Sequence, residues 1–306
     1  MILVGALLLD KWWGEPRRWH PLVGFGNFAT LVEARLNRRK KRVARGVAGW
    51  LLVVTPPVAL IALIDGWLAN HATASLVFSI GIVYLALGNR SLEQHAMAVA
   101  IPLKAGDPEG ARDAVARIVS RDTRPMNATD IAAGATESVL ENGADAVFGT
   151  LFWFLILGVP GAVLHRLANT LDAMWGYRST RFQQFGWWSA RFDDAMNFIP
   201  ARLTALTYSI VGNTRTALHC WWRQGRHLQS PNAGPVMASG AGAIGISLGG
   251  NAYYHGELEI RPRLGPEHSD KNLASADSIA SACGLVRRGI WVWIAIAIVL
   301  GYLGLV

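Results

Sequence analysis

The sequence is poor in charge and in cysteine. Only 16% of its 306 residues are Asp, Glu, Lys or Arg, whereas soluble domains usually carry about 25%. The two cysteines, Cys220 and Cys283, are too few for a disulfide framework or a cysteine zinc site, which argues against redox chemistry. No Walker A motif occurs, so a P-loop nucleotide site is excluded, and the eight histidines show no metal-ligand spacing. The 52% hydrophobic content excludes intrinsic disorder.

The apolar residues are collected into long runs instead of being spread over amphipathic elements. A bilayer core of roughly 30 Å is crossed by about 20 helical residues. Runs of about this length occur at residues 47–70, 72–88, 146–164 and 290–306. The alternative, buried helices of a soluble protein, would need an unusually large core to cover all of them. The sequence therefore predicts an all-α, polytopic integral membrane protein with a single membrane domain over residues 1–306.

A basic arm precedes the first run. It contains seven basic residues and no acid: Arg35, Arg38, Arg39, Lys40, Lys41, Arg42 and Arg45. The positive-inside rule predicts that this arm is cytoplasmic. No nucleic-acid motif accompanies it, so anionic lipid headgroups are the simpler partner. The first two runs form a helical hairpin broken only at Asn70-His71, which returns residues 89–145 to the cytoplasm.

The run at residues 146–164 raises a conflict of topology. A full crossing would carry the polar segment that follows to the outer side, although that segment contains Arg166, Arg178, Arg181 and Arg191. Gly158, Pro160 and Gly161 interrupt the run, and broken helices are tolerated where protein buries them or where they line a cavity. We therefore expect a kinked or re-entrant helix pair that keeps the polar site on the cytoplasmic side.

The polar segments that could form a site are residues 89–145 and 165–289. Asn127 and Asn142-Gly143 mark the expected start and stop of a helix over residues 128–142. Asp130, Glu137 and Glu141 share one face of that helix, and Asp145 follows it. Carboxylates about 4 Å apart repel by roughly 4 kcal/mol at a dielectric of about 20. A divalent cation or an arginine should therefore lie among them, unless this face is simply solvated.

Further charges occur in an apolar context. Asn169 and Asp172 are helical neighbours, and a later segment pairs Arg191 with Asp194 and Asp193 with Asn197 at helical spacing. Charges in such a context near a membrane indicate a functional site, with a structural Arg191–Asp194 ion pair as the alternative.

Two glycine-rich stretches follow. The turn Ser230-Pro-Asn-Ala-Gly234 could hold a phosphate through backbone donors. Residues 240–245 match the dinucleotide fingerprint formally, but no strand precedes them. The glycines there are more typical of close helix packing.

Taken in order, these motifs resemble those of one family. They are His20-Pro21 with Gly24, Arg121-Asp122-Thr123, Glu137-Ser138 with Glu141-Asn142 and Asp145, Arg166 with Asn169-Thr-Leu-Asp172, Ala190-Arg-Phe-Asp-Asp194 with Asn197 and Arg202, Ser230-Pro-Asn-Ala-Gly234, and Leu248-Gly-Gly250 with Tyr254 and Gly256. Over nearly the whole chain the sequence resembles the adenosylcobinamide-phosphate synthases, the membrane amide synthases of cobalamin biosynthesis.

The resemblance implies an ATP-dependent ligation with ATP and Mg²⁺ as cofactors. Adenosylcobyric acid would be joined to aminopropanol phosphate, or to a related amino-alcohol such as ethanolamine phosphate, to give adenosylcobinamide phosphate. The implied catalytic acids are Glu137, Glu141, Asp145, Asp193 and Asp194, of which the first three are also the metal ligands. The implied substrate-binding residues are Arg121, Asp122, Arg166, Asn169, Asp172, Arg191, Asn197, Arg202, Ser230 and Asn232, with Arg191 and Arg202 as phosphate clamps.

The resemblance also implies a multi-pass protein of the cytoplasmic (inner) membrane. Its partners would be the corrinoid, the amino-alcohol phosphate and the lipid bilayer, with no nucleic acid. A homo-oligomer, or contact with other corrinoid-pathway enzymes, is left open. Two other classes fit parts of the pattern: a membrane transporter for a phosphorylated or corrinoid solute, and a signalling or scaffold protein without catalysis.

Overall fold

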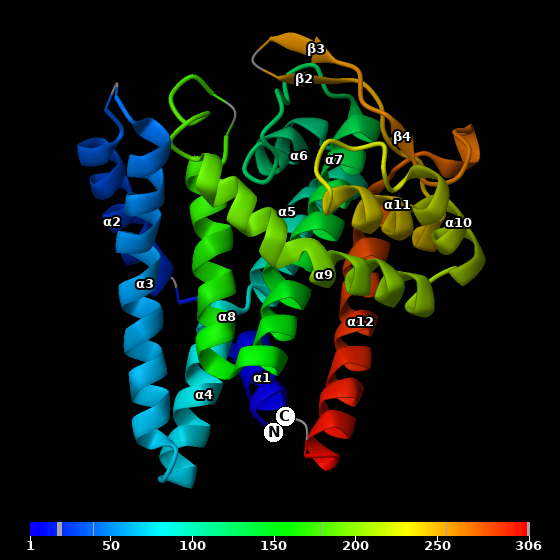
Figure 1. Cartoon of the computed structure of the whole chain (residues 1–306). Coiled ribbons are helices and arrows are strands. Elements are labelled where there is room, and N and C mark those ends of the chain that lie inside the picture. Colours follow the sequence, from blue (N-terminus) through cyan, green and yellow to red (C-terminus); the bar gives the residue numbers. More distant parts are fainter. Residues whose placement is uncertain (17–19, 39, 178, 255, 305–306) are drawn as a thin grey trace. The chain divides into compact units, whose positions relative to one another are not determined.

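The computed structural model describes residues 1–16, 20–38, 40–177, 179–254 and 256–304 (Figure 1). Within them the chain is almost entirely helical, with four short strands. The expected all-α class is confirmed. Arg39 of the basic arm, Arg178, and residues 305–306 at the end of the last apolar run lie outside the described residues.

The chain forms two compact units. The first comprises Met1–Asn89, Asp145–Asn197 and Val299–Val306, and the second comprises Arg90–Ala144 and Phe198–Ile298. Each unit is assembled from several stretches of chain, so neither is a separable segment. The single membrane domain expected over residues 1–306 stays a prediction.

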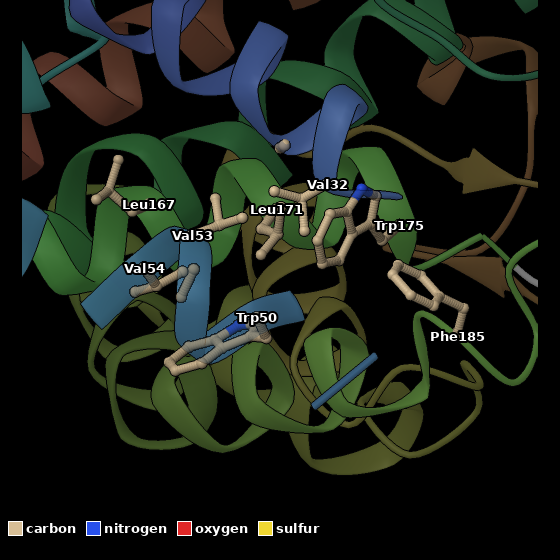
Figure 2. Packing of buried hydrophobic residues seen from close by; sticks show 10 residues of the cluster. Val32, Trp50, Val53, Val54, Leu167, Leu171, Trp175 and Phe185 are labelled. Carbon is tan, nitrogen blue, oxygen red and sulfur yellow. The ribbon is translucent and has the colours of Figure 1, made fainter. Parts of the chain in front are cut away.

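The first unit is a group of helices around one apolar core. Its elements are α1 (Ile2–Trp13), α2 (Pro21–Leu36), α3 (Arg42–Leu68), α4 (Ala72–Ala86), α8 (Gly149–Trp175) and the first part of α9 (Trp187–Val211). Side chains of α2, α3 and α8 interlock in the core, as Figure 2 shows. Trp175 and Phe185 meet edge to face there, with ring centroids 4.9 Å apart. Deleting one buried aromatic of this kind costs about 3–5 kcal/mol of unfolding free energy.

Helix α8 is two helical limbs joined by a reversal. Gly158 has φ 65° and ψ −153°, a conformation that interrupts the helix and that side chains other than glycine rarely adopt. The limbs lie side by side, because Thr150 of the first is 3.2 Å from His165 of the second (Figure 1). The expected kinked helix pair is confirmed.

The second unit combines helices with two small antiparallel strand pairs. Its elements are α5 (Asn89–Lys104), α6 (Pro108–Val115), α7 (Ala128–Asn142), the rest of α9, α10 (Thr214–Gln224), α11 (Ala233–Ile244), β1 (Leu248–Gly249), β2 (Ala252–Tyr254), β3 (Glu257–Glu259), β4 (Arg263–Leu264), η2 (Asp270–Asn272) and α12 (Ala276–Tyr302). Strand β1 pairs with β4, and β2 pairs with β3. Helices α10 and α11 pack together, and Met237, Ala238 and Leu264 form a small core beside them.

Helix α7 begins where the sequence predicts but does not stop there. Asn127 accepts a hydrogen bond from the Asp130 amide, and Asp130 accepts one from the Asn127 amide, which is a complete capping box. The expected stop at Gly143 is wrong. Gly143 keeps helical angles, and the chain continues through the π-helical turn η1 (Gly143–Phe148) into α8. A π turn absorbs an extra residue without ending a helix.

Four helices in the described part of the chain are long and apolar enough to cross a membrane. They are Arg42–Leu68, Ala72–Lys104, which joins α4 and α5, Ala128–Trp175, which joins α7, η1 and α8, and Ala276–Tyr302, and they overlap the four apolar runs. The protein is therefore an all-α polytopic membrane protein. The last helix starts at Ala276, well before the apolar run that begins at residue 290.

Part of the basic arm is used inside the first unit. Arg42 donates to the carbonyl oxygens of Thr180 and Arg181, both at 3.1 Å. Arg181 in turn donates twice to the buried carboxylate of Glu33, at 3.1 and 2.5 Å. Burial alone would raise the pKa of Glu33, but the hydrogen bonds from Arg181 and Asn37 outweigh it and lower that pKa. These contacts fasten the loop before α9 to α2 and α3.

Candidate functional site

Glu137 of α7 is the centre of a buried cluster of opposite charges in the second unit. Its Oε2 accepts from Arg121 and, at 3.0 Å, from Arg261, while Oε1 accepts from the Gly249 amide at 2.7 Å. The Glu137 side chain is 3% exposed and each arginine side chain 13%. Burial opposes the charge on Arg261, but Glu137 more than offsets this and raises the pKa of Arg261. Glu141 lies close enough to Arg121 and Arg261 for its charge to act on both, so two carboxylates balance two guanidinium groups here.

These contacts show which groups neutralise the acidic side chains of α7. The alternatives were a divalent cation, an arginine or solvent, and for Glu137 the partners are arginines. The others differ: Glu141 is exposed, Asp130 caps the helix, and half-buried Asp145 lies in η1. In the described residues no group of three or more His, Cys, Asp or Glu side chains could hold a metal ion. The arrangement therefore does not fit the metal ligation implied for Glu137, Glu141 and Asp145.

The segment containing Arg121 borders a cavity of about 530 Å³. Residues 121–125 form one wall, and Tyr253 and Gly256 of the β2–β3 region form another. Asp122 fastens the two walls, because its amide donates to the Tyr253 carbonyl at 2.8 Å and its carboxylate accepts from the Gly256 amide at 2.7 Å. Asp122 is thus a positioning residue of this wall.

Arg202, expected as a phosphate clamp, is held by groups of its own unit. It donates to the Phe198 carbonyl at 2.7 Å, to Asn232 at 3.3 Å and to the Pro231 carbonyl at 3.2 Å, and it stacks on the Phe198 ring. Burial lowers its pKa.

The expected phosphate turn is also internally bonded. The Ser230 hydroxyl accepts from the amides of Asn232 and Ala233, at 3.3 and 3.2 Å. These two backbone donors therefore have an acceptor already, in a serine-centred turn at the start of α11.

The first unit contains a separate buried network centred on Asp193. Its Oδ2 accepts from Asn197 at 3.1 Å and its Oδ1 from Asn169 at 3.3 Å. Asn197 contacts His165 at 2.9 Å, and His165 contacts Thr150. All these side chains except Asn169 are buried. Burial raises the pKa of Asp193 to about 6; the two asparagines oppose this shift, and the negative charge of Asp194 adds to it.

Two further carboxylates lie near Asp193. Asp172 is close enough to Asp193 and Asp194 for their negative charges to repel one another. Arg191 lies 3.8 Å from Asp194, but its side chain is 64% exposed, and exposed pairs of this kind contribute little stability. The structure thus brings Asp172, Asp193 and Asp194 together, with Asn169 and Asn197 beside them.

Arg166 belongs to a second polar cluster of the first unit, together with Glu15 and His20. Burial is the main cause that lowers the pKa of His20; the charge of Glu15 opposes it and that of Arg166 adds to it. The Nε of Arg166 is buried and has no hydrogen-bond partner among the described residues. Arg166 therefore keeps a donor for which the described protein supplies no acceptor.

Sequence reasoning missed His165, Thr150 and Arg261. Thr150 lies inside the apolar run at residues 146–164 and His165 lies directly after it, where neither spacing nor charge marks them. Arg261 reaches Glu137 across 124 residues of chain. The Leu248-Gly-Gly250 motif did point to Gly249, whose φ of 77° and close approach to the Pro262 carbonyl both require glycine.

Together, the four apolar helices and the buried polar networks define a polytopic membrane protein with internal charged sites. The family described as CobD/Cbib protein matches residues 3–286, and the chain belongs to this family. No solved structure matches the chain.

Curated relatives carry the name "Cobalamin biosynthesis protein CobD". The protein from Stutzerimonas stutzeri is 50% identical over 98% of this chain and 97% of its own. That from Chromobacterium violaceum is 49% identical over 96% and 94%. That from Mycobacterium tuberculosis H37Rv is 39% identical over 88% and 86%.

Proposed function

We propose that the protein catalyses the ATP-dependent ligation of adenosylcobyric acid to an amino-alcohol phosphate, giving adenosylcobinamide phosphate. Membership of the CobD/Cbib family assigns the chain a role in cobalamin biosynthesis. The resemblance of its motifs supports the specific step. We expect the site to face the cytoplasm from the inner membrane, on the side of the basic arm.

The reaction needs an activated carboxylate and a deprotonated amine. An oxygen of the corrinoid carboxylate attacks the γ-phosphorus of ATP, ADP leaves, and an acyl phosphate forms. The amine nitrogen then attacks the acyl carbon, the bond from that carbon to the phosphate oxygen breaks, and inorganic phosphate leaves. The nitrogen gives up a proton, which requires a base.

The structural observation that supports the proposal is the setting of Asp193. Two asparagines orient its carboxylate, and Asp172 and Asp194 lie close by. A pKa of about 6 leaves Asp193 ionised at neutral pH and basic enough to take the proton. We assign that role to Asp193, and we assign attraction of the substrate ammonium to the three carboxylates together.

Phosphate oxygens require donors, and arginines supply them in planar pairs. Arg166, with its unpartnered Nε, and exposed Arg191 are the candidates in the first unit. Arg121 is the candidate in the second. Because the acids of α7 do not fit a metal site, we assign no reaction step to a Mg²⁺ ion bound by the protein itself. The metal would enter with the nucleotide as part of that substrate.

The test is direct. The full-length protein, purified in detergent, is incubated with adenosylcobyric acid, MgATP and either aminopropanol phosphate or ethanolamine phosphate, and the amide is sought by mass spectrometry. We expect one ADP for each amide. ATP turnover without any corrinoid, and with no amide in its presence, would support a transporter instead.

A further inference from the structure

We propose that the cavity beside residues 121–125 is a nucleotide site, in which arginines bind the phosphates of a nucleoside triphosphate and the Tyr253 ring stacks on the base. The inference rests on the proposed ligation, which names no nucleotide contacts. The sequence contains no Walker A motif, so no P-loop can bind the ATP that the ligation needs. The cavity is our candidate for that nucleotide site.

The size of the cavity favours a nucleotide over the amino-alcohol phosphate as its ligand. Small-molecule sites usually measure about 300–1,000 Å³, and this one has about 530 Å³. A phosphorylated three-carbon amine would leave most of that volume empty. A nucleoside triphosphate would fill it.

The charges suit an anion. Arg121 lines the cavity, and its ion pair with Glu137 fixes the direction of its guanidinium. A guanidinium has five N–H donors, so Arg121 can serve Glu137 and a phosphate at once. Arg124 is exposed at the same wall, and Thr123 adds a hydroxyl. Asp122 also lines the cavity, but its single negative charge leaves Arg121 and Arg124 in excess, and one of its carboxylate oxygens accepts from the Gly256 amide.

The β2–β3 side of the cavity offers an aromatic residue. Tyr253 is 41% exposed and lines the cavity. Every nucleotide base has a flat π-face that can stack on an aromatic ring of this kind. The bonds of Asp122 to the Tyr253 carbonyl and the Gly256 amide hold Tyr253 beside the segment that carries the two arginines, so the aromatic and the cationic groups are both fixed before a ligand binds.

Binding measurements on the full-length protein in detergent test the site without any corrinoid. The probes are ATP, inorganic tripolyphosphate and aminopropanol phosphate, titrated by calorimetry. Arg124→Ala should weaken ATP and tripolyphosphate alike, by about 10-fold or more, since both lose a charged hydrogen bond. Arg223→Ala on α10 removes the same charge from an exposed position that does not line the cavity, and it should change neither affinity.

Changes at Tyr253 separate the base from the phosphates. Tyr253→Ala should weaken ATP by about 10-fold through lost stacking and leave tripolyphosphate unchanged. Tyr253→Phe should retain ATP affinity. Equal ATP affinity in wild type, Arg124→Ala and Tyr253→Ala would overturn the proposal, as would an equal loss in Arg223→Ala. Tighter, Arg124-dependent binding of aminopropanol phosphate would overturn the choice of nucleotide.

The inference and the ligation can fail separately. Amide formation with an unchanged KM for ATP in both Arg124→Ala and Tyr253→Ala would overturn this site while the ligation stands. The expected binding pattern without amide formation under any condition would overturn the ligation and support this site.

Discussion

Nε2 of His165 lies 2.9 Å from Oδ1 of Asn197, and this contact sets the direction of a whole buried network. Asn197 donates through Nδ2 to the Asp193 carboxylate, so its Oδ1 must accept. His165 therefore carries its proton on Nε2, and Nδ1 is left to accept from the Thr150 hydroxyl at 3.2 Å. A residue in an apolar helical limb thus orients the amide that holds Asp193.

The first prediction concerns the stability of this network. His165→Ala leaves the Asn197 carbonyl buried without its donor and opens a cavity, so the free energy of unfolding should fall by about 2–4 kcal/mol. Thr150→Val keeps the shape and removes one hydroxyl, so its loss should be smaller. Thermal unfolding in detergent checks both. Equal stability of His165→Ala and wild type would show that the hydrogen bonds of His165 do not form in solution.

The second prediction concerns Asp193 as the base. Asp193→Asn should lower amide formation by about 100-fold, equivalent to roughly 2.7 kcal/mol of transition-state stabilisation, with little change in melting temperature. In wild type the rate should rise with pH through about 6, as Asp193 loses its proton. Asn197→Ala removes a hydrogen bond that lowers this pKa, so the rising limb should move to higher pH. A limb that stays in place in Asn197→Ala would contradict the assignment.

The third prediction separates two acids of α7. Glu137→Gln leaves two buried arginines without their counter-charge and should cost about 3–5 kcal/mol of unfolding free energy. Glu141→Gln changes an exposed residue one turn further on and should leave the melting temperature unchanged. From the sequence alone, both variants would be expected to fold normally and lose activity. Equal melting temperatures of Glu137→Gln and Glu141→Gln would show that the arginine cluster does not contribute to stability.

The fourth prediction is a pH dependence of stability from Glu33. Its pKa is lowered in the folded protein, so its ion pair stabilises the fold above the ordinary glutamate pKa. This contribution is lost as the pH falls through the lowered value. The melting temperature of wild type should therefore drop more steeply below about pH 4.5 than that of Glu33→Gln. Parallel curves for the two proteins would contradict the role of the Glu33–Arg181 pair.

The fifth prediction concerns metal. Chelation of Mg²⁺ should abolish amide formation, because the nucleotide reacts as its magnesium complex. The protein alone should show no saturable Mg²⁺ binding, since the acids of α7 do not gather as ligands in the described residues. Equilibrium dialysis without nucleotide checks this. Stoichiometric binding that is lost in Glu141→Gln would restore the metal role of that acid.

Local and periodic signals in the sequence were sufficient for much of the fold. The apolar runs identified the long helices, and the capping residues Asn127 and Asp130 fixed the start of α7, because both signals act over a few residues. The stop at Gly143 failed because glycine permits a helix end without requiring one. The partners of Glu137 come from three distant segments, and no local pattern contains that information.

The sequence predicted only those contacts of the candidate site that depend on local spacing. Asp193 and Asn197 lie one helical turn apart, so their contact follows from spacing. Asn169 joins them only because the loop before α9 folds back, and His165 only because α8 reverses. Arg202 and Ser230 have the chemistry of phosphate ligands, but their contacts within the protein are visible only in three dimensions.

The reversal at Gly158 limits how far α8 can reach in one direction. An unbroken α8 of 27 residues would be about 40 Å long and would emerge at the far surface of a bilayer. As two limbs joined by a reversal, α8 has a longer limb of about 26 Å, which is less than the roughly 30 Å of a bilayer core. We expect a bilayer to hold this pair as a re-entrant element, and we expect a side chain at position 158 that favours a straight helix to move the network around Asp193 to the other compartment.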